Sequence, residues 1–518
     1  MEIPLETKRI SVCLILFVLN LAAAIEIPLT VQQLPTITTQ PTDQVAFPFD
    51  DEFSIKCEAK GNPPAIFNWT KDGKPFSLLG DSRITTFNNS GTFVVKNRGN
   101  IAFFQGKYRC YASNELGTSM SEEIELIVPG IPKFPKEKID PIDVEHGDAM
   151  VLRCNPPKGI PPLHIYWMNI DLQHIPQDER VSMGLNGDLY FANVDENDSR
   201  SDYCCFAAFP KLRTIVQKMS MTLTVTRSNL IKERKPKLLI PESSGASSEV
   251  TFMKGMDLFL ECIAEGLPTP HLTWRRINKT SIFRGVAENF GKVLKIEQVT
   301  KDDEGTYECV ASNDLGETKH EFKVRVEEPP TWVNKPKSGV FSVGGSFVLL
   351  CEAIGFPEPT IKWKKNGIPL EDNEIKSSRA AFSTREISII DLELSDTAVY
   401  QCEATNKHGT ILATANIDVL NIPPEILTPD GEEYVAVMGY SSHLYCQFFA
   451  IPTPDISWTK DDSMQLLEVD QNGTLEIRET RKEDAGFYTC LVKNSVGKRA
   501  ITATLTVRGD INMNINNS

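Results

Sequence analysis

The chain contains 518 residues, which is long for a single hydrophobic core and therefore suggests several domains. Hydrophobic residues make up 41% and charged residues 24%, an ordinary globular balance, and the formal net charge is -15. This acidic balance disfavours nucleic-acid binding, because phosphates would be repelled.

The first 24 residues are expected to be a signal peptide. Lys8 and Arg9 precede an apolar stretch at 10–21, and the alanines at 22–24 offer a small-residue cleavage site. A membrane anchor is the alternative, but the stretch is short. No later stretch approaches the roughly 20 apolar residues that a membrane helix needs. We therefore expect a secreted mature chain that begins at Ile25.

Five repeats follow, and each contains a Cys, a Trp twelve or thirteen positions later, and then a Tyr-x-Cys phrase. This spacing is typical of immunoglobulin sandwiches. In an oxidising compartment each Cys pair would form a disulfide, worth roughly 4 kcal/mol in the chain-entropy model. No repeat supplies a close pair of zinc ligands. The expected pairs are Cys57 with Cys110, Cys154 with Cys205, Cys262 with Cys309, Cys351 with Cys402, and Cys446 with Cys490.

The Tyr-x-Cys phrase has a physical explanation in a strand. Residues two apart point to the same face, so Tyr and Cys both point inward. The Tyr hydroxyl is expected to bond the preceding corner, and the Trp to pack on the disulfide. Four repeats place Asn and Gly behind the Cys, as in "YRCYASNELG", which suits a tight hairpin with positive φ.

The second repeat departs from this pattern because it reads "YCCFAAFPKL". The register selects Cys205 as the partner of Cys154, so Cys204 should face outward. Once Cys13 leaves with the signal peptide, Cys204 is the odd thiol. An intermolecular disulfide is one alternative, and a covered or modified thiol is the favoured one.

The expected fold is all-β, with tandem immunoglobulin-like sandwiches of the I-set type. The junction between the second and third repeats carries 13 to 15 extra residues, enough for the chain to fold back. We expect a horseshoe in which the first domain packs on the fourth and the second on the third. The expected organisation is a signal peptide at 1–24, domains at 34–127, 128–226, 238–327, 328–421 and 422–508, a long hinge linker at 227–237, and a flexible tail at 509–518.

Several long strings resemble the neurofascin–neuroglian (L1) family of neural cell-adhesion molecules, among them "CNPPKGIPPLHIYWMN", "DYCCFAAFPKLRTIVQKM" and "HGTILATANIDV". The resemblance covers roughly 25–508. It implies a four-domain horseshoe that binds itself and other neural surface proteins, in support of neurite outgrowth, axon guidance and cell–cell adhesion. Family members continue into further domains, a membrane helix and an ankyrin-binding tail, which are not expected here. A shortened secreted form and an incomplete gene sequence are the two alternative explanations. The expected location is secreted or extracellular, or the cell surface for a full-length form.

The resemblance also implies one partner site, and the residues themselves supply a second candidate. Family members carry a Phe-Ala-Ser-Asn-basic-Leu phrase implicated in contact with neuropilin. Here Glu115 reverses the basic charge, and the same hairpin recurs as "VASNDLG", so a structural role is the alternative. The matching residues are Tyr111, Ala112, Ser113, Asn114, Glu115 and Leu116. The integrin-type tripeptide Arg508, Gly509 and Asp510 follows the last strand, where a chance match is the favoured interpretation.

Other candidate sites are weaker. A basic cluster in the hinge could bind heparan sulfate, but a solvated hinge is the favoured interpretation, because Glu233 interrupts the cluster. The cluster consists of Lys232, Arg234, Lys235 and Lys237. Sequons predict N-glycosylation at Asn68, Asn88, Asn197, Asn278, Asn472 and Asn516.

No catalytic or metal constellation stands out, so we expect neither an enzyme nor a cofactor. The seven His residues are scattered. The favoured function is neural adhesion and recognition. The alternatives are the ligand-binding region of a signalling receptor, a soluble decoy form, and an intracellular structural array, which the signal peptide argues against.

Overall fold

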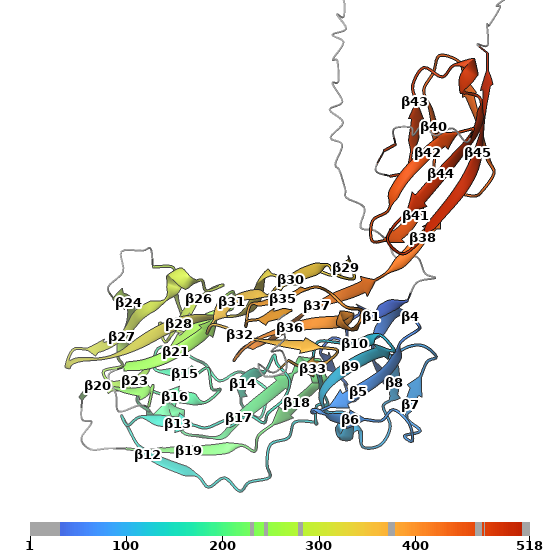
Figure 1. The fold of residues 1–518 in the computed structure, drawn as a ribbon. Coiled ribbons are helices and arrows are strands. Elements are labelled where there is room, and N and C mark those ends of the chain that lie inside the picture. The colour runs from blue at the N-terminus through green and yellow to red at the C-terminus, as the bar shows by residue number, and fades with distance from the viewer. Residues whose placement is uncertain are drawn as a thin grey trace, which may run out of the picture.

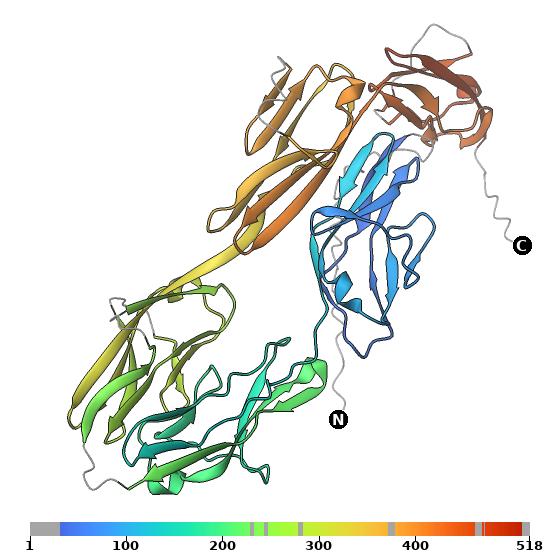
Figure 2. The same cartoon turned by 90° about the horizontal axis from the view of Figure 1, so that it is seen from below.

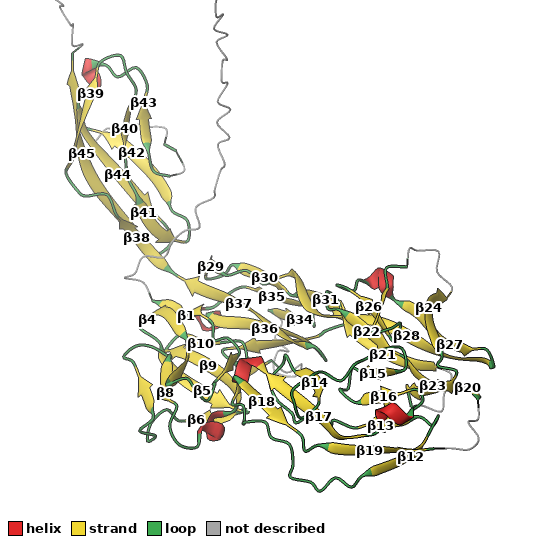
Figure 3. Cartoon of the chain, turned by 180° about the vertical axis from the view of Figure 1, so that it is seen from behind, coloured by secondary structure: helices red, strands yellow, loops and turns green. Residues whose placement is uncertain are grey.

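The computed structural model describes residues 32–227, 233–242, 247–277, 283–370, 379–461, 469–470 and 472–509. These ranges form five β-sandwiches in chain order, as Figure 1 shows. Strands dominate them, and short 3-10 turns mark some of the corners (Figure 3). The all-β fold of tandem immunoglobulin-like sandwiches is thereby confirmed. The predicted signal peptide lies outside the described residues.

The first sandwich packs a sheet of order β3-β8-β7 against a sheet of order β2-β11-β9-β5-β6, and β10 adds to β9. Its elements are β1 (Gln33–Thr39), β2 (Gln44–Val45), β3 (Glu52–Ile55), β4 (Glu58–Asn62), β5 (Ile66–Lys71), β6 (Lys74–Phe76), β7 (Ile84–Thr86), β8 (Phe93–Lys96), η1 (Ile101–Phe104), β9 (Gly106–Asn114), β10 (Gly117–Met120) and β11 (Ile124–Ile127).

The second sandwich packs β13-β16-β15 against β12-β19-β17-β14, and β18 adds to β17. Its elements are β12 (Ile142–Glu145), β13 (Met150–Leu152), β14 (His164–Met168), β15 (Val181–Met183), β16 (Leu189–Phe191), η2 (Glu196–Asp198), β17 (Arg200–Phe209), η3 (Pro210–Leu212), β18 (Thr214–Gln217) and β19 (Met221–Thr226).

The third sandwich packs β22-β26-β25 against β21-β28-β27-β24. Its elements are β20 (Arg234–Ile240), β21 (Ser247–Met253), β22 (Leu258–Glu261), β23 (Ile263–Leu267), β24 (His271–Ile277), β25 (Val286–Glu288), β26 (Val293–Ile296), η4 (Lys301–Asp303), β27 (Gly305–Asn313) and β28 (Gly316–Asn334). Because β20 begins at Arg234 and pairs with β23, the last residues of the predicted 227–237 linker lie in a sheet. In this part of β20 the side chain of Pro236 is buried, whereas those of Lys235 and Lys237 are exposed.

The third and fourth sandwiches share one strand. β28 pairs with β21 up to Glu327 and with β31 from Glu328 onward, so no loop separates the two sandwiches. The fourth sandwich packs β30-β35-β34 against β29-β37-β36-β32-β33. Its further elements are β29 (Gly339–Ser342), β30 (Ser346–Leu350), β31 (Glu352–Phe356), β32 (Thr360–Lys365), β33 (Ile368–Pro369), β34 (Ala380–Phe382), β35 (Glu386–Ile390), η5 (Leu394–Asp396), β36 (Ala398–Asn406) and β37 (Gly409–Leu420).

The fifth sandwich follows β37 after a single residue and points away from the other four (Figure 1). It packs β40-β43 against β39-β45-β44-β42. Its elements are β38 (Ile422–Ile426), β39 (Glu432–Val437), β40 (Ser442–Leu444), β41 (Phe448–Ile451), β42 (Asp455–Lys460), β43 (Leu475–Ile477), η6 (Lys482–Asp484), β44 (Gly486–Lys493) and β45 (Lys498–Arg508).

Each core is built around a disulfide, a Trp and a Tyr. In every sandwich the Tyr hydroxyl donates to a backbone carbonyl four or five residues upstream, at 2.6 to 3.3 Å, which ties the strand to its corner. The Trp indole donates to a carbonyl across the sandwich at 2.8 to 3.2 Å. The structure joins Cys57 to Cys110, Cys154 to Cys205, Cys262 to Cys309, Cys351 to Cys402, and Cys446 to Cys490.

The Asn behind the Cys has a different role from the one expected. Asn114 does not have positive φ; its side chain donates to the carbonyls of Gln33 and Pro63 and accepts the amide of Leu116. It therefore holds the hairpin and the neighbouring strand β1 together. The same side-chain bonds recur at Asn313, Asn406 and Asn494.

In the second sandwich a Phe replaces this Asn. Phe209 is buried in a small apolar cluster that includes Phe47 from the first sandwich. An apolar contact between two sandwiches therefore takes the place of a hydrogen-bonded hairpin. The departure of "YCCFAAFPKL" from the other four repeats thus accompanies a contact between the first and second sandwiches.

Cys204 is not exposed as the strand alternation predicts. It is the free cysteine of the described residues, and its side chain is 1% exposed. Burial raises the pKa of its thiol. The prediction fails because β17 is covered on both faces, so pointing away from the disulfide does not mean pointing into water. A covered thiol agrees with the favoured alternative.

The first four sandwiches fold back on themselves, which confirms the predicted horseshoe. Figure 2 shows the first sandwich beside the fourth and the second beside the third. Contacts between β10 and β36 and between β1 and β37 join segments about 280 to 380 positions apart. The long junction after β19 allows this reversal.

Candidate functional site

The junction between the first and fourth sandwiches is built on the outward residue of the Tyr-x-Cys phrase. In the fourth sandwich this residue is Gln401, which is 0% exposed. Its amide nitrogen donates to the backbone oxygen of Met120 at 2.8 Å, and its oxygen accepts the Met120 amide at 3.2 Å. The Gln401 side chain thus bonds the backbone of β10 at its edge in the way that a neighbouring strand would.

An ion cluster lies next to this pair. Glu403 Oε1 accepts from Arg109 Nη1 at 2.6 Å, and Glu403 Oε2 lies 2.8 Å from Lys364 Nζ. The three side chains are only 12 to 15% exposed. Burial alone would raise the pKa of Glu403, but Lys364 and Arg109 outweigh it and lower that pKa. Arg109 thus contributes a charge to a carboxylate 294 positions away.

Strand β1 completes the junction against β37. Asn416 Nδ2 donates to Thr36 Oγ1 at 2.7 Å. Asp418 is 7% exposed, and among the described residues its Oδ1 has no hydrogen-bond partner. Burial raises the pKa of Asp418 to about 6, although the backbone of Leu34 opposes the shift.

The second and third sandwiches are joined mainly by hydrogen bonds from side chains of one sandwich to backbone groups of the other. Asn193 Nδ2 donates to the carbonyl of Gly266 at 2.9 Å, while the amide of Gly266 donates to the carbonyl of Ala192 at 3.2 Å. Asn289 donates to the carbonyl of Met183 at 2.9 Å. These bonds join β15 and the residues just after β16 to the third sandwich.

This second junction also buries ionisable groups. Glu261 accepts the amide of Leu185 at 2.6 Å, and Lys292 donates to Ser182 Oγ at 2.5 Å. Burial raises the pKa of Glu261 to about 7 and lowers the pKa of Lys292 to about 8. Asp188 lies close enough to raise the Glu261 pKa further.

These two junctions join the first sandwich to the fourth and the second to the third. Within the described ranges, no group of three or more His, Cys, Asp or Glu side chains is placed to hold a metal ion. Among the residues that the structure describes, no helix combines the length and apolar character needed to cross a membrane.

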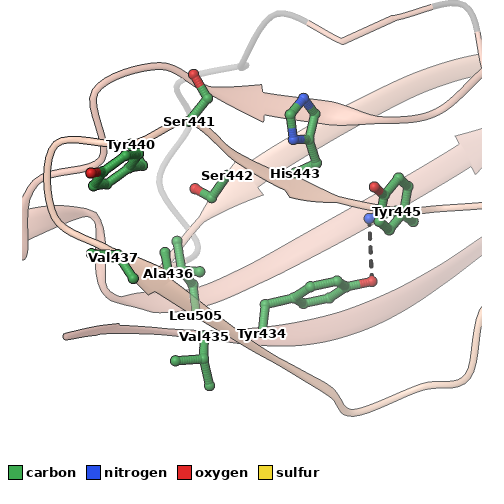
Figure 4. Close-up of a pocket in the computed structure, with 10 residues that line it drawn as sticks. All are labelled: Tyr434, Val435, Ala436, Val437, Tyr440, Ser441, Ser442, His443, Tyr445 and Leu505. Carbon is green, nitrogen blue, oxygen red and sulfur yellow. Dashed lines mark hydrogen bonds between the residues drawn. The ribbon is translucent and has the colours of Figure 1, made fainter.

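A groove of about 570 Å³ opens in the fifth sandwich between β39 and β40 (Figure 4). Tyr434, Tyr440 and Tyr445 line it together with His443. The Tyr434 hydroxyl accepts the Tyr445 amide at 3.2 Å, which bridges the two strands. Tyr440 is largely exposed, so the groove presents an aromatic rim to solvent.

The hairpin with the neuropilin-type phrase lies at the first junction. The ring of Tyr111 lies beside Gly367 of the fourth sandwich, and Asn114 is occupied in holding the hairpin. Ala112 is buried, Ser113 bonds Thr118, and Leu116 is half-buried. Glu115 at the turn is exposed and accepts from Gln32 at 2.5 Å.

The other predicted sites lie apart from one another. Arg508 is exposed at the end of β45, Gly509 follows it, and Asp510 lies outside the described residues. Arg234 and Lys237 face acidic partners, with Lys237 Nζ 3.6 Å from Glu265. Lys232 lies outside the described residues. The sequon residues Asn68, Asn88, Asn197 and Asn472 are exposed, and Asn278 and Asn516 lie outside the described residues.

The residues that form the junctions were not identified from the sequence. Gln401 and Arg109 both occupy the x of Tyr-x-Cys, and strand alternation already places that position on the outer face. The sequence does not show what covers this face, because the partner lies in a sandwich far along the chain.

Family comparison agrees with the observed sandwiches. Residues 330–419 and 424–507 match the immunoglobulin I-set domain, and residues 35–114 and 235–313 match an immunoglobulin domain. Together these segments lie in four of the five sandwiches.

Curated relatives match nearly the whole chain. Human neural cell adhesion molecule L1-like protein is 58% identical over 515 residues, which is 98% of this chain and 42% of the relative. Human neural cell adhesion molecule L1 is 43% identical over 92% of this chain and 39% of the relative. Chicken neuronal-glial cell adhesion molecule is 41% identical over 92% of this chain and 38% of the relative. The chain therefore spans about two-fifths of the length of these relatives.

Solved structures share the fold. Sidekick-1 immunoglobulin domains 1–5 superpose with a TM-score of 0.60 at 22% identity, covering 92% of this chain and all of that one. The insect immune protein hemolin superposes with a TM-score of 0.58 at 23% identity, covering 75% of this chain and all of that one.

Proposed function

The chain belongs to the L1 family of neural cell adhesion molecules, and we propose that it is an extracellular recognition segment that mediates cell–cell adhesion. It binds copies of itself and other neural surface proteins, and through them supports neurite outgrowth and axon guidance. The activity is binding without chemical reaction, and the location is secreted or cell-surface.

The buried pair of Met120 and Gln401 is the single observation that supports this proposal best. It joins the first sandwich to the fourth, so that the four folded-back sandwiches present one broad body. A typical specific interface buries roughly 1,600 Å² of accessible surface in total, and a broad body provides such an area more readily than one sandwich edge. Weak contacts between such bodies would be strengthened when many copies cluster on one surface.

Bead clustering tests the proposal. Beads coated with the full chain should aggregate with one another, and beads coated with Gln401→Arg should aggregate much less, because a buried charge would open the junction. Thr489→Arg changes the same outward position in the fifth sandwich and is the matched control. Beads with the unaltered chain that stay dispersed at every coating density would remove homophilic adhesion from the proposal.

Neuropilin contact is a finer proposal for the hairpin at 111–116. Tyr111 and Asn114 make contacts within the chain. Glu115 accepts from Gln32 but is exposed at the turn, so it is the part of the hairpin that a partner would reach first. Glu115→Lys should therefore change neuropilin binding at least as much as Tyr111→Ala does, without unfolding. Equal binding by both variants and the unaltered chain would refute this site.

Integrin contact at Arg508, Gly509 and Asp510 is a second finer proposal, and of these three residues the structure describes Arg508 and Gly509, both exposed. The backbone oxygen of Arg508 accepts the amide of Met438 at 3.0 Å, so the strand holds the first residue while its side chain stays exposed. Asp510→Glu should abolish integrin-dependent cell attachment. Attachment that persists in this variant would exclude the tripeptide.

A further inference from the structure

A second groove, of about 420 Å³, opens at the edge of the first sandwich between β5, β6 and the loop after β7. Ile66 and Leu79 line it and are 70% and 83% exposed. Phe67 and Leu78 line its deeper part and pack against the core. Contiguous exposed apolar surface of this kind usually marks a covered or binding face.

An attachment point for a sugar lies inside this groove. Asn68 lines it, is exposed, and begins the sequon Asn68-Trp69-Thr70. Strand alternation turns Asn68 outward beside Ile66, while Trp69 points into the core. On the opposite rim, Asn89 and Ser90 also line the groove and belong to the sequon at Asn88.

We propose that the N-linked glycan of Asn68 lies in this groove and covers its apolar surface. A pyranose ring has an apolar C–H face and a polar edge. The first N-acetylglucosamine of the glycan packs its apolar face on Ile66 and Leu79. The hydroxyl groups of this sugar reach the polar lining residues Ser77 and Asn89. The inference rests on the secretory route and does not depend on the adhesion function.

Attachment needs only the standard donor of the secretory pathway, a lipid-linked oligosaccharide diphosphate. The Asn68 amide nitrogen forms a bond to the anomeric carbon, the bond from that carbon to the diphosphate oxygen breaks, and an amide proton leaves with the diphosphate. No oxidation or reduction takes place.

The position of Asn68 also gives the glycan a place relative to the first junction. Asn68 lies opposite Tyr111 in the β5–β9 ladder, and Tyr111 contacts the turn at Gly367 in the fourth sandwich. The glycan of Asn68 therefore leaves the chain beside the junction and lies in the groove between β5, β6 and the loop after β7. A protein partner would have to use another face of the first sandwich.

Enzymatic release of glycans from the native protein tests whether the Asn68 glycan lies in the groove. The full chain is expressed in secretory cells, and mass spectrometry follows removal by a peptide amidase at Asn68 and at the exposed Asn472. Release at Asn68 should be about tenfold slower than at Asn472, because the groove shields the sugar linkage at Asn68 from the amidase. The double variant Ile66→Thr with Leu79→Ser should speed release at Asn68 alone.

Hydrogen exchange gives a second readout that does not depend on the groove variant folding well. Thr70→Ala abolishes the sequon but keeps Asn68, and it should increase amide exchange at 76–79. Asn472→Gln is the matched control and should leave that segment unchanged. An unoccupied Asn68, release at the same rate as Asn472, or unchanged exchange in Thr70→Ala would each overturn the proposal.

Discussion

Gln401 and Met120 lie 281 positions apart and hold each other through two hydrogen bonds, with both residues fully buried. The side-chain amide of Gln401 donates to the carbonyl of Met120 and accepts from the N–H of the same residue. This pairing is the point at which the chain closes on itself, so it is the natural place to test the folded-back arrangement.

Gln401→Ala should loosen the first junction. It leaves the buried amide and carbonyl of Met120 without partners, which costs about 1 to 3 kcal/mol. We expect a larger radius of gyration in X-ray scattering and little change in the stability of the separate sandwiches. Thr489→Ala, at the same position of the fifth sandwich, should change neither quantity; an equal effect of both variants would contradict the role of Gln401.

Glu403→Gln should open the junction more strongly. Arg109 and Lys364 would then face each other as poorly solvated cations, and breaking such a cluster costs about 3 to 5 kcal/mol. Adding Arg109→Ala to this variant should recover part of the loss. Double-mutant analysis of thermal unfolding measures this coupling, and simple additivity of the two changes would refute it.

Acidification from neutral pH should tighten the first junction. Because burial raises the pKa of Asp418 from 3.8 to about 6, its contribution to stability is complete below pH 3.8 and is lost as the pH rises through 6. The shift corresponds to about 3 kcal/mol. Asp418→Asn should therefore stabilise the junction at pH 7.5 and flatten the dependence between pH 4 and 7.

The pH experiment has an internal contrast. The pKa of Glu403 is lowered, so the stability it adds is present above its usual value of 4.5 and is lost as the pH falls through its folded-state pKa. Junction strength should thus rise from pH 7.5 to about 5 and fall again in stronger acid. A steady decrease over the whole range would contradict the assignment of Asp418.

Cys204 should be inert in the native protein. Its thiol is buried and its pKa is raised, so both access and thiolate formation are disfavoured. An alkylating probe under non-reducing conditions should modify Cys204 only after unfolding, and the chain should run as a monomer without reductant. Rapid native labelling, or loss of a dimer band in Cys204→Ser, would show that the thiol is accessible.

Asn494→Ala should destabilise the fifth sandwich by about 1 to 3 kcal/mol. The change removes hydrogen bonds to the carbonyls of Ile422 and Pro452 and frees the amide of Val496. Calorimetry should show one transition moved to lower temperature. Gln447→Ala, which removes an exposed amide side chain of the same sandwich, is the control and should leave that transition in place.

The repeated core was predictable because its chemistry is local. A Cys, a Trp and a Tyr at regular spacing point to a bridged sandwich, and the observed Tyr108 and Trp69 bonds follow from that. The reversal of the chain was predictable from the long junction after β19, because reach along the chain limits geometry.

The contacts between sandwiches were not predictable in the same way. The outward residue of Tyr-x-Cys is Arg109 in one repeat and Gln401 in another, and each meets a surface contributed by a distant segment. In the second repeat it is Cys204, which is buried within its own sandwich beside Gln217. The role of Asn114 was missed for a related reason. Its side chain bonds carbonyls 51 and 81 positions away, which hairpin statistics do not reveal.

Small-angle X-ray scattering of the mature full chain tests the folded-back arrangement most directly. Five sandwiches end to end, each about 34 Å long, would extend to about 170 Å. The arrangement described here predicts a maximum dimension well short of that and an increase in Gln401→Arg but not in Thr489→Arg. A rod of full length that is unchanged by Gln401→Arg would contradict it.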